Sequence, residues 1–387
     1  MMSRSARQDA RAMRRGLDAR LAAANFDLAP FTLAWEITRA CALACLHCRA
    51  QAQPRRNPRE LKTTEAMGVI DQIRELGDPI LVVTGGDPLM RRDVYELLAY
   101  AVHKGLRTSL TPSTTALVTP KNLARVSKAG VRRIAISLDG PTAEVHDRFR
   151  GFNGSFQRAL EIMRDVPETG LALQINTTVS RYNLPVLEEM PEIVAKARAV
   201  QWSVFFLVPT GRGKAEDMIS AEEHERVFHW LYDLSRQAPF DVKSTAAPAY
   251  RRVAIQRAQA ERQDGSERSA RPVAGAGYRF EDGLDRPGLG VNDGKGFAFI
   301  SHIGEVCPSG FLPLAAGNVR QRPLADIYRR SPLFRDLRDP DKLKGRCGAC
   351  ELRAVCGGSR ARAWALSGDY LAEDPSCVYR PQTAAAG

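Results

Sequence analysis

Short apolar runs alternate with amphipathic stretches six times between residues 31 and 210, and this alternation restricts the chain to few folds. The apolar runs are rich in β-branched residues, whereas the segments between them have helical spacing. Strands that alternate with helices pair as a parallel sheet, because each helix carries the chain back to the same edge. The predicted strands are Phe31–Thr38, Ile80–Thr84, Arg107–Thr111, Arg133–Asp139, Ala172–Val179 and Gln201–Val208.

The predicted helices support the same architecture. Two of them begin at capping signals, Thr63 or Thr64 with Glu65, and Thr119 followed by Pro120. The helices lie near Thr64–Leu76, Arg91–Lys104, Thr119–Ala129, Ser155–Asp165 and Pro185–Ala197. We therefore predict an α/β fold, a partial (β/α)6 TIM-type barrel. In such barrels the working residues follow the C-terminal ends of the strands.

Three cysteines directly follow the first predicted strand, in the spacing CxxxCxxC: Cys41, Cys45 and Cys48. Three thiolates can hold three irons of a [4Fe–4S] cube and leave the fourth iron without a protein ligand. Covalent haem attachment would need CxxCH, whereas His47 here precedes the last cysteine. A zinc ion would need a fourth ligand, either His47 or a distant group, and stays an alternative.

A second group of cysteines lies near the C-terminus and has the pattern CxxCx5C plus one later cysteine. Its members are Cys347, Cys350, Cys356 and Cys377. Four thiolates can hold a complete [4Fe–4S] cluster or a zinc ion. Cys307 stands apart and is a buried thiol, a labile ligand or a substrate contact. Cysteines grouped in this way suit metal binding in a reducing compartment better than a disulfide framework.

Composition and charge narrow the class of protein further. The chain has 387 residues, 44% of them hydrophobic, and a formal net charge of +12. It contains no run of about 18 apolar residues and no signal-peptide core, so we predict a cytoplasmic protein without a membrane span. The basic residues are dispersed and accompany no nucleic-acid motif, which disfavours nucleic acid as partner. An anionic substrate, an acidic peptide and a solvated basic surface all fit the charge.

The chain divides into four predicted parts. After the barrel we expect a helix over 216–240, a basic helix from Arg251 to Arg262, a flexible loop in the middle of 251–290 and a strand over Gly296–Ser301. The parts are a basic N-terminal segment (1–29), the core barrel (30–215), a helical connection with a flexible basic loop (216–295) and a cysteine-rich module (296–387).

The first cysteine group, together with Gly85-Gly86-Asp87-Pro88 after the second strand, resembles the radical S-adenosylmethionine (radical SAM) superfamily. In that family SAM binds the open iron, and one electron from the cluster cleaves it to a 5′-deoxyadenosyl radical. The resemblance implies a set of SAM contacts, each of which also has an ordinary structural interpretation. They are Gly85, Gly86, Asp87 and Pro88 at the methionyl amino group, Ser137 and Asp139 near the ribose, Asn176 on the fifth strand, His47 beside the adenine and Arg212 for a carboxylate.

The C-terminal cysteines resemble the SPASM extension of radical SAM enzymes, whose full form binds two auxiliary clusters. Cys347, Cys350, Cys356 and Cys377 match the ligands of the outer cluster, while only Cys307 could serve an inner one. The resemblance therefore implies a second, auxiliary [4Fe–4S] cluster and no third.

Further motifs resemble the branch that modifies tetrapyrroles, such as Fe-coproporphyrin decarboxylases and enzymes of d1-type haem synthesis. These motifs include Trp35–Ala40, Leu207–Arg212, Phe299–His302 and Cys356–Arg362. We hypothesise hydrogen abstraction from an anionic substrate such as a tetrapyrrole propionate, with the surplus electron leaving through the auxiliary cluster and a flavodoxin- or ferredoxin-type protein as reductant. The alternatives are a maturase of ribosomally made peptides and a non-catalytic iron–sulfur redox sensor. Tyr250, His302 and Glu305 line the substrate space or are structural.

Overall fold

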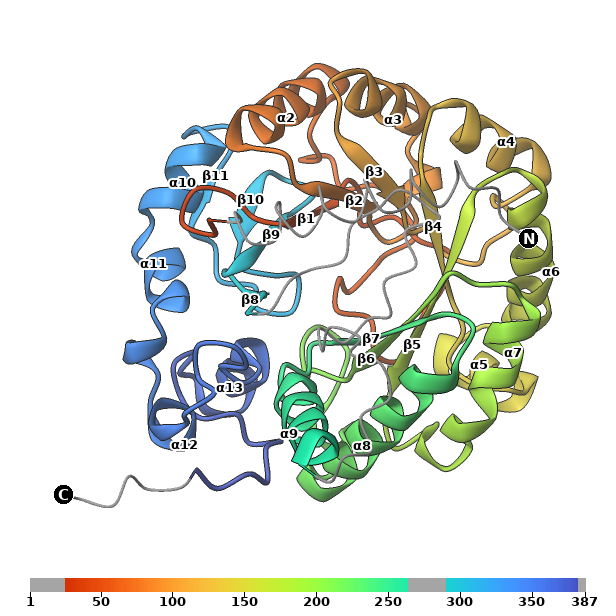
Figure 1. The fold of residues 1–387 in the computed structure, drawn as a ribbon. Coiled ribbons are helices and arrows are strands. Elements are labelled where there is room, and N and C mark those ends of the chain that lie inside the picture. Colours follow the sequence, from red (N-terminus) through yellow and green to blue (C-terminus); the bar gives the residue numbers. More distant parts are fainter. Residues whose placement is uncertain (1–24, 264–289, 382–387) are drawn as a thin grey trace, which may run out of the picture.

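The computed structural model describes residues 25–263 and 290–381, and its centre is a sheet of parallel strands that follow one another in chain order (Figure 1). The strands are β1 (Thr32–Glu36), β2 (Ile80–Thr84), β3 (Arg107–Leu110), β4 (Arg133–Ser137), β5 (Ala172–Val179), β6 (Gln201–Phe206) and β7 (Asp241–Thr245). The predicted α/β fold is confirmed, and the sheet is an open barrel. The sequence prediction missed β7 because Val242 is the only apolar residue of that strand.

Helices cover the outer side of this sheet (Figure 1). They are α2 (Thr63–Leu76), α3 (Val94–His103), α4 (Pro120–Lys128), α5 (Ala143–Arg150), α6 (Ser155–Glu168) and α7 (Met190–Lys196). The Thr119 hydroxyl caps α4 as predicted, accepting from the Asn122 amide at 3.2 Å. Helix α2 instead has Lys62 at its N-cap, whose amide donates to Glu65 at 2.7 Å. The prediction missed α5.

The C-terminal part of the chain continues the barrel sheet. Strand β9 (Gly296–Ile300) pairs in parallel with β1, and β10 (Glu305–Cys307) and β11 (Gly317–Asn318) follow in antiparallel order. A short strand, β8 (Asn292–Asp293), pairs with β9. Both sides of the predicted division at residue 296 therefore share one sheet, and the division into four parts stays a prediction.

Of the remaining helices, α8 and α9 lie near β7, and the others belong to the C-terminal part (Figure 1). These helices are α8 (Ala221–Gln237), α9 (Ala249–Gln263), α10 (Leu324–Arg330), α11 (Pro332–Arg338), α12 (Gly345–Ala349) and α13 (Arg360–Ser367). Helix α9 confirms the expected basic helix, and most of the expected flexible loop lies outside the described residues. No helix among the described residues is long and apolar enough to cross a membrane.

Helix α13 fastens the C-terminal part to the far edge of the barrel. The side chain of Arg362 is fully buried, and its Nη2 donates to the carbonyl oxygens of Leu207 and Ala246 at 3.3 and 3.1 Å. These acceptors follow β6 and β7. The C-terminal part therefore contacts both edges of the open barrel, through β9 at β1 and through Arg362 near β7.

Candidate functional site

The three barrel cysteines lie together in the loop after β1, which we call the cysteine loop (residues 39–53). Cys41 and Cys45 are buried, and Cys48 packs against them. Each sulfur accepts a hydrogen bond: Cys41 from the Leu43 amide at 3.4 Å, Cys48 from the Ala52 amide at 3.4 Å, and Cys45 from Arg150 Nη1 at 3.8 Å. Donors aimed at sulfur stabilise thiolates, the form that binds metal.

The barrel cysteines are buried thiols with three sulfurs in one loop. Burial raises the pKa of the Cys41 and Cys45 thiols, a shift that a bound cation would oppose. Three thiolates suit three irons of a cubane cluster, whereas a zinc ion would need a fourth ligand.

The loop after β6 is hydrogen-bonded to the cysteine loop. Arg212 Nε donates to the Cys45 carbonyl at 2.8 Å, and the Arg212 amide donates to the Cys48 carbonyl at 3.0 Å. Gly211 has φ +69°, and a Cβ there would collide with the Cys48 carbonyl oxygen. Arg212 was predicted to bind a carboxylate, but its Nε and its backbone amide hydrogen-bond to the cysteine loop. Its Nη2 is buried and has no hydrogen-bond partner among the residues that the structure describes.

The Gly85-Gly86-Asp87-Pro88 segment packs against the end of β1. The Gly86 amide donates to the Thr38 carbonyl at 2.8 Å, and a Cβ on Gly86 would lie 2.5 Å from the Ala40 carbonyl oxygen. The Asp87 carboxylate is fully buried, and it accepts from the Thr115 hydroxyl at 2.7 Å and the Leu89 amide at 3.1 Å. Burial raises its pKa. The glycines thus permit close backbone contact, and the Asp87 side chain caps the short helix η1 (Pro88–Met90).

His47 lies within the cysteine loop, between Cys45 and Cys48, and its ring packs on an aromatic neighbour. Its ring stacks on Phe149 with a centroid separation of 4.1 Å and an interplanar angle of 9°. Burial, with the charge of Arg150, lowers the pKa of His47 well below its ordinary value, so the ring is neutral at physiological pH. Its Nδ1 is buried, and within residues 25–263 and 290–381 it has no hydrogen-bond partner. A neutral ring with an unused nitrogen fits a heteroaromatic ligand such as adenine.

The predicted ribose contacts separate into two groups. Ser137 on β4 and Asn176 on β5 are neighbours in register and both half-buried, so they share one face of the sheet. Asp139 is fully buried; its carboxylate pairs with Arg150 at 2.5 Å and accepts from the Thr178 amide at 2.7 Å. Asp139 thus holds Arg150, which donates to Cys45. The sequence prediction missed Arg150 because it lies on α5, a helix without a strong capping signal.

A buried charge network joins β1, the cysteine loop and the C-terminal part. The Glu36 carboxylate accepts from His302 Nδ1 at 2.9 Å, Arg49 Nη1 at 2.9 Å and Arg39 Nε at 3.1 Å. Burial by itself would raise the pKa of Glu36, but the His302 hydrogen bond and the two arginines outweigh it and lower the pKa to about 2. His302, a candidate for the substrate space, therefore serves this network.

The remaining candidates from the sequence are buried elsewhere. Cys307 on β10 is buried, which raises its pKa to about 12, and the nearby carboxylates of Glu305 and Glu36 add to the effect. It lies beside the Glu36 network. Tyr250 is buried in the main hydrophobic core next to Phe228.

The C-terminal cysteines form a second sulfur-rich site, which we call the auxiliary site. Burial raises the pKa of Cys356 to about 12, and the nearby Cys377 and Cys347 add to the effect. Cys347 Sγ accepts from the Asp374 amide at 3.3 Å and from Arg360 Nη2 at 3.5 Å, and Cys356 Sγ accepts from the Gly358 amide at 3.5 Å. The auxiliary site thus repeats the donor pattern of the barrel site.

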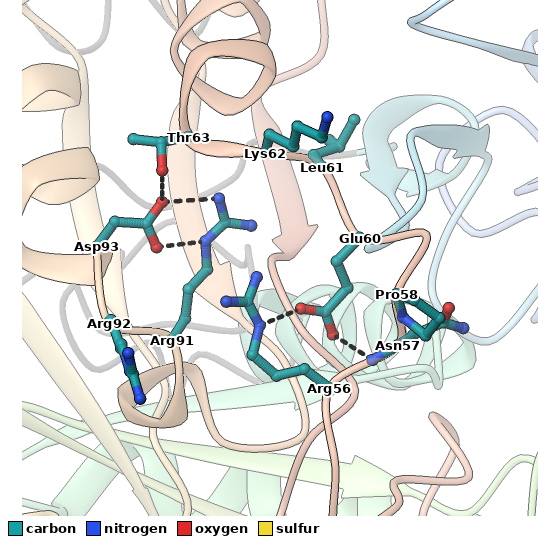
Figure 2. Close-up of a pocket in the computed structure, with 10 residues that line it drawn as sticks. All are labelled: Arg56, Asn57, Pro58, Glu60, Leu61, Lys62, Thr63, Arg91, Arg92 and Asp93. Carbon is teal, nitrogen blue, oxygen red and sulfur yellow. Dashed lines mark hydrogen bonds and ion pairs between the residues drawn. The ribbon is translucent and has the colours of Figure 1, made fainter.

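A polar cavity of about 460 Å³ is lined by the segment that precedes α2 and by the turn before α3 (Figure 2). Buried Glu60 accepts from the Thr38 hydroxyl at 2.6 Å and from Arg56 Nε at 2.6 Å, which ties the cavity wall to the end of β1. Asp93 pairs with Arg91 at 2.7 Å. Both acids of the lining are therefore paired, while Lys62 and Arg92 are exposed. The cavity surface is cationic.

Comparison with known proteins covers most of the chain. The model of the Radical SAM superfamily matches residues 35–200. A protein named AdoMet-dependent heme synthase from Nitratidesulfovibrio vulgaris is 44% identical over 352 residues, which is 90% of this chain and 92% of that protein. A second protein of the same name, from Methanosarcina barkeri, is 42% identical over 353 residues, covering 91% of this chain and 97% of that protein.

Among solved structures, the chain is similar to Streptococcus suis SuiB bound to S-adenosylmethionine. The TM-score is 0.68 at 16% sequence identity, and the match covers 98% of this chain and 84% of that one. At this identity the likeness shows the fold alone. It extends beyond the barrel into the C-terminal part.

Proposed function

This chain belongs to the radical SAM superfamily, and from that premise we propose that it is a haem-biosynthesis enzyme that oxidatively decarboxylates propionate side chains of an iron porphyrin. The observation that carries the proposal is 44% identity to a protein named AdoMet-dependent heme synthase, over 90% of this chain and 92% of that protein. The reducing compartment that suits its cysteines is the cytoplasm.

The barrel residues have the donors that the family's cofactors need. Cys41, Cys45 and Cys48 would hold a [4Fe–4S] cluster, because all three sulfurs already accept hydrogen bonds. His47 Nδ1 and Arg212 Nη2 would contact SAM, since both are buried and no other group in the described part of the chain hydrogen-bonds to them. The backbone of Gly85–Pro88 and the side chains of Ser137 and Asn176 complete the proposed contacts. Bound together, cluster and SAM supply a radical that abstracts hydrogen.

The auxiliary site would hold a second [4Fe–4S] cluster, with Cys347, Cys350, Cys356 and Cys377 as its ligands. Backbone amides and Arg360 donate to two of these sulfurs. Loss of CO2 from a propionate breaks a carbon–carbon bond and leaves a vinyl group, one hydrogen atom and one electron. The second cluster would accept that electron, because iron–sulfur clusters carry single electrons.

The cationic cavity surface suits an acidic electron donor of the flavodoxin or ferredoxin type. Of the basic residues in Figure 2, Arg56, Lys62 and Arg92 are exposed, and all three line one cavity. Complementary charge speeds the encounter of two proteins and is screened by salt. Charge reversal at Arg92 should slow reduction by such a donor at low salt, while dithionite, a small reductant, should still reduce the enzyme.

Anaerobic incubation with SAM, dithionite and Fe-coproporphyrin tests the proposed reaction. We expect 5′-deoxyadenosine together with a porphyrin that has lost carboxyl groups, both measured by mass spectrometry. SAM cleavage without any change in the porphyrin would contradict the proposal and favour the peptide-maturase alternative. An EPR spectrum that SAM leaves unchanged would favour a redox sensor.

A further inference from the structure

Arg360 is a buried cation beside a cysteine sulfur. Its side chain is 1% exposed, and its Nη2 lies 3.5 Å from Cys347 Sγ. Its other hydrogen-bond partners are neutral carbonyl oxygens, those of Tyr370 at 3.0 Å, Ala372 at 2.6 Å and Gly358 at 3.3 Å. A Cβ on Gly358 would lie 2.7 Å from Arg360 Nη2 and 2.9 Å from the same sulfur, so glycine there allows guanidinium and sulfur to approach.

Arg251 on α9 is a second cation near the same site, and its side chain is half-buried. Its Nη1 donates to the Val355 carbonyl at 3.3 Å and its Nη2 to the Val291 carbonyl at 2.5 Å. Burial lowers the pKa of Arg251, and the nearby Cys356 opposes that shift. Within the described residues, neither Arg251 nor Arg360 has a carboxylate oxygen within 4.0 Å.

Arg360 is buried and Arg251 is half-buried. The Asp374 and Asp369 carboxylates interact with Arg360 at longer range, and Asp374 lies closer to Arg362, at 3.7 Å. Two shielded cations without a carboxylate oxygen within 4.0 Å among the described residues are therefore stabilised by a further anion nearby. Taking a charge out of water costs several kcal/mol, and carbonyl dipoles offset only part of that cost. Four cysteine thiolates around an iron–sulfur cluster carry net negative charge, and reduction adds one more unit. Cations held in a low-dielectric setting therefore stabilise the reduced form more than the oxidised form, which raises the reduction potential.

The arginine that donates to sulfur at the barrel site has a different charge balance. Arg150 donates to Cys45 and is paired with Asp139 at 2.5 Å. A neutralised pair changes the potential of a nearby centre less than a lone cation does, because the two charges largely cancel. Arg212 also lies at the barrel site, where it donates to the carbonyl oxygens of Cys45 and Ala52. The sulfur-bonded arginines Arg150 and Arg360 therefore differ in charge balance.

We propose that Arg251 and Arg360 are the counter-ions of the auxiliary cluster and raise its reduction potential, so that it accepts an electron from the substrate. This inference rests on the proposed function, which places the cluster there. Both arginines act as positioning residues, through charge and, for Arg360, through the hydrogen bond to Cys347.

Redox titration followed by EPR tests the inference in a full-length background with Cys41, Cys45 and Cys48 replaced by Ala, so that only the auxiliary cluster contributes. Arg251→Gln and Arg360→Gln should each lower the equilibrium constant for reduction about tenfold, which is about 59 mV for a one-electron couple. Arg360→Lys keeps the charge and should restore most of the potential. Arg353→Gln is the control, because Arg353 is 39% exposed and pairs with Asp341 at 3.0 Å; its potential should stay near the parent value.

The outcomes separate the inference from the function on which it rests. A parent protein without iron, or with zinc, in the auxiliary site would refute the proposed cluster. Intact clusters with unchanged potentials in both Gln variants would overturn the counter-ion role. If the Gln variants lose the cluster, Arg360→Lys decides: a retained cluster at the parent potential supports the inference, and a lost cluster overturns it.

Discussion

The barrel site and the auxiliary site use the same chemistry, hydrogen bonds donated to cysteine sulfur, in two different settings. The barrel site has three cysteines, and among the described residues buried polar atoms of His47 and Arg212 near it have no hydrogen-bond partner. The auxiliary site has four cysteines and two arginines, Arg360 buried and Arg251 half-buried, and in the described part of the chain neither has a carboxylate oxygen within 4.0 Å. One chain thus carries two cysteine groups that differ in the number of sulfurs and in the polar groups around them.

Removing the barrel cysteines should abolish SAM cleavage. Replacing Cys41, Cys45 and Cys48 by Ala leaves no ligands for the open cluster, so 5′-deoxyadenosine formation should fall to the level measured without enzyme. The auxiliary site is built from other elements and should keep its iron. If the variant still cleaves SAM, the barrel cysteines do not hold the cluster that SAM binds.

Removing the auxiliary cysteines should separate SAM cleavage from product formation. With Cys347, Cys350, Cys356 and Cys377 replaced by Ser, we expect 5′-deoxyadenosine formation within a few-fold of wild type and loss of porphyrin decarboxylation. Both products can be followed in one anaerobic assay. If this variant still decarboxylates the porphyrin fully, the auxiliary site is not needed for the reaction. Circular dichroism checks that the variant is folded.

Gly211→Ala should loosen the barrel site selectively. At φ +69° a side chain is strained, and a Cβ would also collide with the Cys48 carbonyl. We expect barrel-site iron and SAM cleavage to fall about tenfold, the equivalent of about 1.4 kcal/mol. Gly105→Ala is the matched control, since Gly105 has φ +83° and nothing within 4 Å of a Cβ. If both variants lose iron and SAM cleavage equally, backbone strain at positive φ explains the loss and the contact with Cys48 does not.

Glu36→Gln should destabilise the joint between barrel and C-terminal part. The pKa of Glu36 is lowered from 4.5 to about 2, which corresponds to about 3 kcal/mol of stability. Because the folded-state pKa is the lower one, this stability is present above pH 4.5 and is lost as pH falls toward 2. Urea unfolding at pH 7 should show the loss, and the variant should be less sensitive to acid than wild type. An unchanged acid sensitivity would contradict the network's role.

Much of the barrel was predictable from the sequence, because strand and helix periods are local signals. Strands β2 and β5 begin and end where predicted. The sequence prediction missed strand β7, which is almost entirely polar, and helix α5, whose N-terminus has no side-chain capping hydrogen bond. The parallel pairing of β9 with β1 also escaped, because it joins residues more than 250 positions apart.

The candidate site was predictable by residue type and less so by contact. The cysteines of each group lie together as expected. Arg212 was expected to bind a carboxylate, yet two of its side-chain nitrogens hold the cysteine loop. Asp139 pairs with Arg150, a residue that no sequence motif marks. Such roles depend on tertiary contacts, which spacing along the chain does not encode.

Counting iron and sulfide after anaerobic reconstitution tests the two-site account most directly. Wild type should hold about eight irons and eight sulfides per chain, and the variant with Cys41, Cys45 and Cys48 replaced by Ala about four of each. The variant's remaining cluster should give an EPR signal that does not respond to SAM. About four irons in wild type and none in the variant would contradict the account, because the auxiliary site would then hold no cluster.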